Sequence, residues 1–198
     1  MAFGKDLRKK VEKFKSSTVH LGFETEADWV SVGNYAMNKL ISGSYKKAFP
    51  YGRSVLIGGE SGSGKSLVLA TAAAQAQKKD NAHVVWLDAE NATTDQWLKD
   101  LDVDISEDNF TYLNVATVED VKSLVADVVA LSDKQNDGQK IFIVVDSWSN
   151  LMTEKQQKEA ESGVVKGDQG QQAKQLKDVI KGTTHMITRR PIIFAGFF

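Results

Sequence analysis

A glycine-rich stretch at residues 58–70, GGESGSGKSLVLA, combines residue types that can hold phosphate groups. Its centre has the spacing G-x-x-x-x-G-K-[ST], formed by Gly59, Glu60, Ser61, Gly62, Ser63, Gly64, Lys65 and Ser66. Glycines let successive backbone N–H groups turn inward, and Lys65 adds positive charge beside the β- and γ-phosphates. The Ser66 hydroxyl is a suitable ligand for Mg²⁺. The stretch therefore predicts a nucleoside triphosphate cradle, against the alternative of a glycine-rich turn without a ligand.

Two acidic segments could complete such a site. Asp146 closes the apolar run IFIVVDS, where a carboxylate at a strand end can serve the magnesium ion. The segment VVWLDAEN places Asp88 and Glu90 at another strand end. We expect Glu90 to orient or deprotonate a water molecule aimed at the γ-phosphate, and Asp88 to be structural. The alternative is that these carboxylates only end their strands.

The elements that must position these residues alternate along the chain. Apolar runs predict strands at 54–59, 83–90, 110–115, 140–147 and 191–198. Helical patterns lie between them at 65–78, 93–101, 118–129 and 169–188. Strand–helix alternation of this kind predicts an α/β fold with a mostly parallel sheet covered by helices. Shorter helices are expected at 5–15 and 33–42, with a loop at 42–53 between the second helix and the first strand.

Charge is balanced overall but unevenly distributed. The 198 residues contain 25 Lys and Arg and 26 Asp and Glu, for a net charge of −1. Residues 1–16 and 166–190 are basic, whereas 80–137 are rich in carboxylates. A neutral protein can still bind a polyanion through one basic face, although charge alone favours the alternative that these lysines lie on solvated helix faces.

Other functional classes are excluded by composition. The chain has no cysteine, so it forms no disulfide or thiolate metal site, and its three histidines have no metal-ligand spacing. No run approaches the ~20 apolar residues of a membrane span, and the charged start differs from a secretion signal. We therefore expect a cytoplasmic protein, in the host cytoplasm if a phage encodes it, that has no membrane partner.

Several segments together resemble one family. The chain resembles the RecA-type homologous recombinases, and among them the UvsX recombinases of tailed phages. The resemblance is carried by the phosphate loop, VVWLDAEN, FIVVDSWSNL and GDQGQQAKQLKDVIK, in that order, and covers about residues 29–196. It implies a RecA-like ATPase core at 29–198, incomplete at its C-terminus, preceded by an N-terminal helical extension at 1–28 that docks on a neighbouring protomer.

The resemblance also implies roles for individual residues. Glu90 falls on the water-activating glutamate, and Thr94 and Trp97 fall where the family touches the adenine base. Residues 154–170 fall on the first DNA-binding loop, which contains Lys166 and Gly167. Lys174 and Lys181 fall on positions that contact the DNA backbone, and their spacing of seven places them on one helix face.

One position departs from the family. The family has a polar γ-phosphate sensor near the end of its last strand, where this chain has about Phe197. The family's second DNA-binding loop and later strands have no counterpart before Phe198. We therefore expect a truncated or interrupted reading frame, in which Phe197 and Phe198 need not be native.

The implied activity is DNA-dependent ATP hydrolysis, with Lys65 and Glu90 as its catalytic residues. ATP and Mg²⁺ are the expected cofactors. Single-stranded DNA, homologous duplex DNA and self-association into a filament are the expected partnerships, used for homologous pairing and strand exchange. The alternatives are a ring helicase built on the same core, and a fragment that binds nucleotide or DNA without turnover. A small-molecule kinase fits less well, because the basic residues are mostly lysines rather than the arginines of a phosphate-clamping lid.

Overall fold

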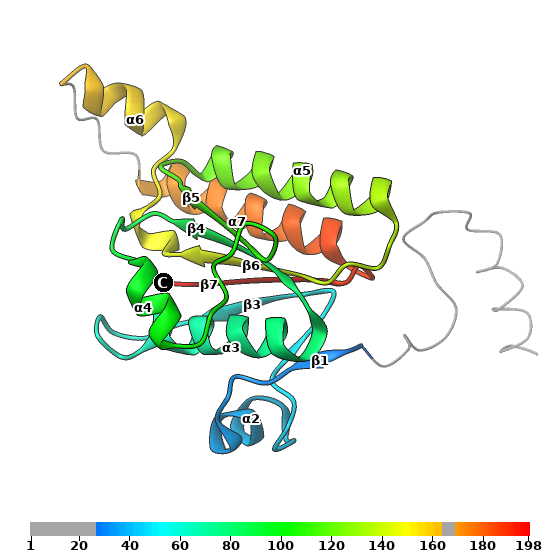
Figure 1. Ribbon diagram of the computed structural model, residues 1–198. Helices are drawn as coiled ribbons and strands as arrows, with labels where there is room; N and C mark the ends of the chain where they lie inside the picture. The colour runs from blue at the N-terminus through cyan, green and yellow to red at the C-terminus, as the bar shows by residue number, and fades with distance from the viewer. Residues whose placement is uncertain (1–26, 164–168) are drawn as a thin grey trace, which may run out of the picture.

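A computed structural model describes residues 27–163 and 169–198, and its centre is a five-stranded parallel sheet (Figure 1). The strand order is β3–β7–β6–β4–β5. The strands are β3 (Arg53–Ile57), β7 (Ile192–Phe197), β6 (Ile141–Asp146), β4 (His83–Asp88) and β5 (Phe110–Asn114). Helices cover both faces of this sheet, so the predicted α/β fold with a mostly parallel sheet is confirmed.

Successive side chains of each strand point to opposite faces of the sheet, and each face is covered by its own layer of helices. In β6, Phe142 and Val144 pack toward α3 (Lys65–Asp80), and α4 (Asp95–Asp100) lies in the same layer. Ile143 and Val145 pack toward α5 (Val118–Gln135) and α7 (Gln169–Ile187). All six residues of β6 are buried, as the continuous apolar run predicts for a parallel strand covered on both faces.

The strand order brings the carboxyl ends of β3, β4 and β6 to the same edge of the sheet. The chain runs from edge strand β3 to β4 and on to the other edge, β5, before β6 and β7 fill the gap between β4 and β3. The loop between β3 and α3 therefore lies at the carboxyl end of the sheet, near the ends of β4 and β6. There, Asp88 and Asp146 are paired in the register of those neighbouring strands. Ligand sites in open parallel sheets form outside this edge, where the order of the strands reverses.

A small unit precedes the sheet. It contains β1 (Trp29–Val30), α2 (Tyr35–Ser42) and β2 (Phe49–Pro50), with β1 and β2 antiparallel. Buried Asn38 organises it, because its side chain accepts from Val32 N at 3.0 Å and donates to Tyr45 O at 2.8 Å. The expected helix at 33–42 is present as α2, whereas the segment expected as a loop includes strand β2. The helix expected at 5–15 lies outside the described residues.

The segment after β6 differs from the sequence expectation. A short 3₁₀ turn, η1 (Trp148–Asn150), leads into helix α6 (Glu154–Glu161), which projects from the body in Figure 1. Residues 154–161 were expected to begin a loop. They form a helix because Thr153 and Gln156 make a reciprocal capping box, which satisfies free N–H groups at the helix start. Helix α6 buries none of its residues.

Across the described part of the chain, none of the helices is both long and apolar enough to traverse a lipid bilayer.

Candidate nucleotide site

The phosphate loop has the backbone that its glycines predict. Gly62 and Gly64 have φ of +75° and +87°, in the left-handed region that favours glycine. Gly64 is the N-cap of α3, so the free N–H groups of the helix's first turn open onto the loop. The Lys65 ammonium donates to Gly59 O and Glu60 O, each at 2.8 Å. The loop thus gathers amide donors and one cation at a helix N-terminus, an arrangement suited to phosphate.

Ser66 and Asp146 meet below this loop. The Ser66 side chain lies close enough to the Asp146 carboxyl group, which is 4% exposed, to favour its ionised form. Burial, together with the charges of Asp88 and Glu90, raises the pKa of Asp146 to about 7, although Ser66 and Lys65 act in the opposite direction. The carboxylates of this site therefore outnumber its cation, and added positive charge would favour the ionised form of Asp146.

These donors suit a magnesium ion. Mg²⁺ prefers oxygen ligands and keeps several of its waters, so one carboxylate and one hydroxyl beside a triphosphate are sufficient protein ligands. Ser66 and Asp146 are the residues that would hold it. Within residues 27–163 and 169–198, no group of three or more His, Cys, Asp or Glu side chains is placed to bind a metal by itself.

Asp88 organises the loop that carries Glu90. Its fully buried carboxylate accepts from the backbone N–H groups of Glu90, Asn91 and Thr93 at 2.7–3.0 Å. The Tyr112 hydroxyl donates to it from β5 at 2.8 Å. Burial opposes ionisation of Asp88, but these hydrogen bonds outweigh it and lower its pKa. Asp88 is therefore the structural residue that the sequence indicated.

Glu90 is exposed at the end of this loop, yet it has a specific partner. The hydroxyl of Ser147, a residue that is 1% exposed, donates to Glu90 Oε1 at 2.8 Å. Ser147 directly follows Asp146, so one short segment supplies the candidate metal ligand and the contact that positions Glu90. Sequence analysis missed both Ser147 and Tyr112, because their partners lie 57 and 24 residues away.

Phe197 lies beneath the phosphate loop. It is 4% exposed and belongs to the core cluster on the α3 face, and its ring centroid lies 5.3 Å from Lys65 Nζ. The position expected for a polar γ-phosphate sensor thus makes a cation–π contact with the loop lysine.

The residues expected at the adenine base lie at the start of α4. The Thr94 hydroxyl accepts from Trp97 N at 3.3 Å and caps the helix. The Trp97 ring is half-buried, packs on the core and meets Trp86 edge-on, with 6.4 Å between ring centroids. Both positions therefore have structural contacts, and base recognition by them stays a prediction.

The residues expected to contact DNA are only partly described. Lys174 and Lys181 are exposed on α7, on one face of that helix. Lys166 and Gly167 lie outside the described residues. The α7 lysines do not join the nucleotide site, because their helix covers the α5 side of the sheet while the phosphate loop opens α3 on the opposite side.

Comparison with protein families agrees with this geometry. A family model of the RecA N-terminal domain matches residues 5–195, nearly the whole chain. The chain belongs to the RecA family. RecA-family proteins act in DNA recombination and repair, bind DNA, form filaments and generally use ATP with Mg²⁺. Comparison with curated proteins finds no match.

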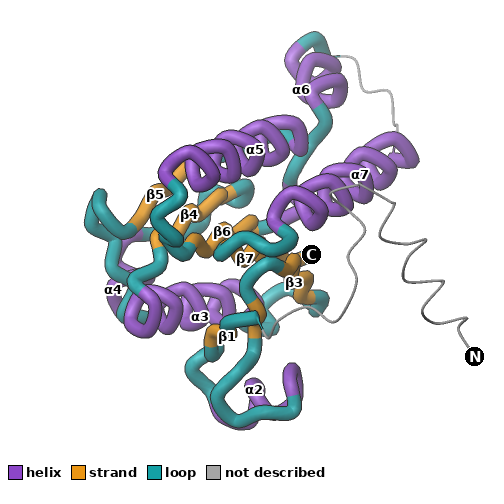
Figure 2. Tube along the Cα trace, turned by 90° about the vertical axis from the view of Figure 1, so that its right-hand side faces the viewer, coloured by secondary structure: helices purple, strands orange, loops and turns teal. Residues whose placement is uncertain are grey.

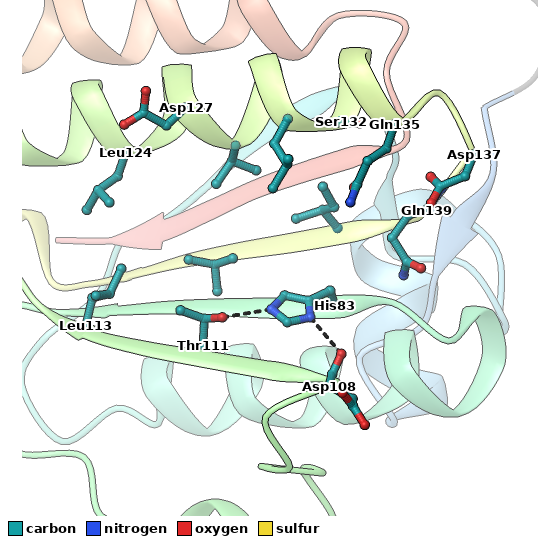
Figure 3. Close-up of a pocket in the computed structure, with 14 residues that line it drawn as sticks. His83, Asp108, Thr111, Leu113, Leu124, Asp127, Ser132, Gln135, Asp137 and Gln139 are labelled. Carbon is teal, nitrogen blue, oxygen red and sulfur yellow. Dashed lines mark hydrogen bonds between the residues drawn. The ribbon is translucent and has the colours of Figure 1, made fainter.

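This RecA-family chain also has a groove along the sheet edge formed by β5, on the other side of the sheet from edge strand β3. The groove of about 510 Å³ runs between edge strand β5 and α5, beside the first residues of β4 and β6 (Figure 3). Its apolar lining consists of Val85, Leu113, Leu124, Val128, Leu131 and Ile141. Its polar lining includes the carboxylates Asp108, Asp127 and Asp137. His83 fixes one wall through contacts to Thr111 Oγ1 at 2.8 Å and Asp108 O at 3.0 Å.

Proposed function

We propose that this chain binds ATP and single-stranded DNA, promotes homologous pairing and strand exchange with duplex DNA, and hydrolyses ATP. The observation that carries the proposal is the convergence of Lys65, Ser66, Asp146 and Glu90 at one edge of a RecA-family sheet. Among RecA-like recombinases, the segment around Asp88 and residues 167–174 favour a relationship to the UvsX proteins of phages.

The proposed chemistry assigns one task to each residue. The loop amides and Lys65 balance the charge of the β- and γ-phosphates. Ser66 and Asp146 would hold Mg²⁺, which would neutralise charge that develops on the phosphate oxygens. Glu90 orients a water molecule and takes its proton as the water oxygen bonds to the γ-phosphorus and ADP leaves.

Lys65 provides the direct test of this assignment. ATP turnover should be measured with and without single-stranded DNA for the parent chain and for Lys65→Ala. We expect the variant to lose the DNA-stimulated turnover, because the phosphate charge is then unbalanced. Lys78→Ala is the matched control, since Lys78 lies on the same helix and pairs with exposed Asp102 at 2.9 Å. Stimulated turnover that survives Lys65→Ala would reject the site, and ATP binding without turnover in the parent would favour the fragment alternative.

Lysines on α7 are the proposed contacts to the DNA backbone. Lysine–phosphate contacts give binding that tolerates any sequence and weakens with salt. We expect Lys174→Gln and Lys181→Gln each to weaken single-stranded DNA binding and to reduce its salt dependence by about one phosphate contact. The measurement is a salt series of binding titrations. Unchanged slopes would remove α7 from the proposed DNA surface.

We also propose that filament assembly uses the groove between β5 and α5. Its apolar floor and three carboxylates complement residues 5–15, which carry Leu7, Val11 and Phe14 at helical spacing among an excess of lysine and arginine. In this arrangement, the N-terminal segment of one copy occupies the groove of the next. Leu131→Asp in the groove should reduce assembly in sedimentation experiments. Leu40→Asp, which alters an apolar side chain that is 85% exposed elsewhere, is the control.

A further inference from the structure

The small unit before the sheet exposes aromatic rings beside lysines. Tyr35 and Tyr45 are 72% and 60% exposed. Lys39 connects them. It lies four residues after Tyr35 on the same face of α2, and its ammonium lies 5.1 Å from the centroid of the Tyr45 ring. The result is a strip in the order Tyr35, Lys39, Tyr45.

The charge around this strip has one sign. Residues 29–59 contain no aspartate or glutamate, although the whole chain has 26 of them. The same stretch contains four cations, Lys39, Lys46, Lys47 and Arg53. Lys46 and Lys47 are exposed and directly follow Tyr45. Unlike the groove beside β5, with its three carboxylates, this surface attracts an anion.

The strip is separate from the lysines of α7. The small unit contacts α3 through β1, and α3 lies on the face of the sheet opposite to α7. Figures 1 and 2 show α2 below the α3 layer and α7 on the far side of the strands. A ligand on α2 would therefore occupy a different side of the molecule from one on α7.

We propose that the strip of Tyr35, Lys39 and Tyr45, with Lys46 and Lys47, is a second binding surface for single-stranded nucleic acid. Exposed rings offer stacking to any base, and neighbouring lysines contact the phosphates, so the combination binds single strands with little sequence preference. The inference deepens the proposed function and rests on it for the choice of DNA.

Binding of a labelled oligothymidylate to the full chain without nucleotide tests this surface. The comparison uses a Lys174→Gln/Lys181→Gln parent, in which the α7 surface is weakened. The double variant Tyr35→Ala/Tyr45→Ala of this parent should bind about tenfold more weakly, because each ring supplies stacking. Tyr35→Phe/Tyr45→Phe is the matched control and should bind like the parent, since the aromatic faces remain. Equal binding by the parent and the alanine double variant would overturn the proposal.

Photocrosslinking locates the contact independently. An oligonucleotide containing 5-iodouracil should crosslink to peptides that contain Tyr35 or Tyr45. Crosslinks confined to peptides of α7 would overturn the proposal. Leu40 tests whether the rings carry the contact. Leu40→Ala should leave oligonucleotide binding unchanged, and a larger loss from Leu40→Ala than from the tyrosine double variant would overturn the assignment of stacking to Tyr35 and Tyr45.

The two hypotheses fail in different experiments. The proposed ATPase site is rejected if Lys65→Ala keeps its stimulated turnover, whatever happens at α2. The α2 surface is rejected if the tyrosine double variant binds the oligonucleotide normally, whatever happens at the phosphate loop. Circular dichroism and a thermal melt should give the parent's values for the tyrosine variants, because both side chains are exposed.

Discussion

The Ser147 hydroxyl donates a hydrogen bond of 2.8 Å to Glu90, joining the segment after β6 to the loop after β4. Glu90 is exposed, whereas Ser147 is almost fully buried. A carboxylate at the surface is thus held by a buried donor. In the proposed reaction, this contact makes Ser147 a positioning residue for the group that handles water.

Removal of this donor tests that role. Ser147→Ala should lower kcat by about tenfold, as expected for a hydrogen bond to a charged group, while ATP binding stays close to the parent value. In a Glu90→Gln background, the same change should have little further effect, because the group it positions can no longer take a proton. The measurement is steady-state ATP turnover of both single variants and the double variant. If the fold losses in kcat of the two single variants simply multiply in the double variant, Ser147 does not act through Glu90.

The buried carboxyl group of Asp146 predicts a dependence of stability on pH. Its pKa of about 7 lies above the value of 3.8 for an unperturbed aspartate, so the folded chain holds this proton more tightly than the unfolded chain. The contribution of Asp146 to stability is therefore present below pH 4 and is lost as pH rises through 7. In nucleotide-free protein without added metal, Asp146→Asn should be more stable than the parent at pH 8, by at least about 1 kcal/mol.

Denaturant unfolding at several pH values measures this difference. The advantage of Asp146→Asn should shrink between pH 7 and pH 4, where the parent's carboxyl group becomes protonated on folding. A difference that does not change with pH would contradict the raised pKa.

The network around Asp88 predicts a large effect on folding. Asp88→Asn replaces one acceptor oxygen with an amide donor, so at least one buried N–H or hydroxyl group loses its partner. The free energy of unfolding should fall by about 1–3 kcal/mol. Tyr112→Phe removes one donor only, from a partly exposed ring, and should cost less, about 1 kcal/mol. Chemical denaturation of both variants gives the comparison, and the reverse order would show that the loop is held by other contacts.

Close packing of β7 against the turn after β6 predicts that a larger residue at Gly196 lowers the stability of the chain. A Cβ atom added at Gly196 would overlap the Trp148 ring and approach Val145 O to 3.1 Å, and Trp148 is fully buried. Gly196→Ala should therefore destabilise the chain by about 1–3 kcal/mol or more. Gly182→Ala on α7 is the control, since its Cβ would meet no atom within 4 Å and alanine favours helix. Thermal melts should shift in opposite directions, and equal shifts would contradict the packing.

Two local elements, helix α6 and strand β2, differ from what the sequence predicts. The family resemblance places a DNA-binding loop at residues 154–170, yet Thr153 and Gln156 cap a helix there. Strand β2 was missed because only two residues form it and its partner β1 is equally short. The basic helix expected at 5–15, and the DNA-binding roles of Lys166 and Gly167, concern residues that the structure does not describe.

The sequence by itself determined the local features, which depend on residues that lie close together along the chain. The spacing of Gly59, Gly64 and Lys65 specifies a turn and a helix start within eight positions, and continuous apolar runs specify buried parallel strands. Only the tertiary structure decided the strand order and the contacts of Glu90, Asp88 and Lys65 with Ser147, Tyr112 and Phe197. The physical reason is that apolar parallel strands are nearly interchangeable as sequences. Which of them become neighbours, and so which side chains meet at their ends, is settled by helix packing across the whole sheet.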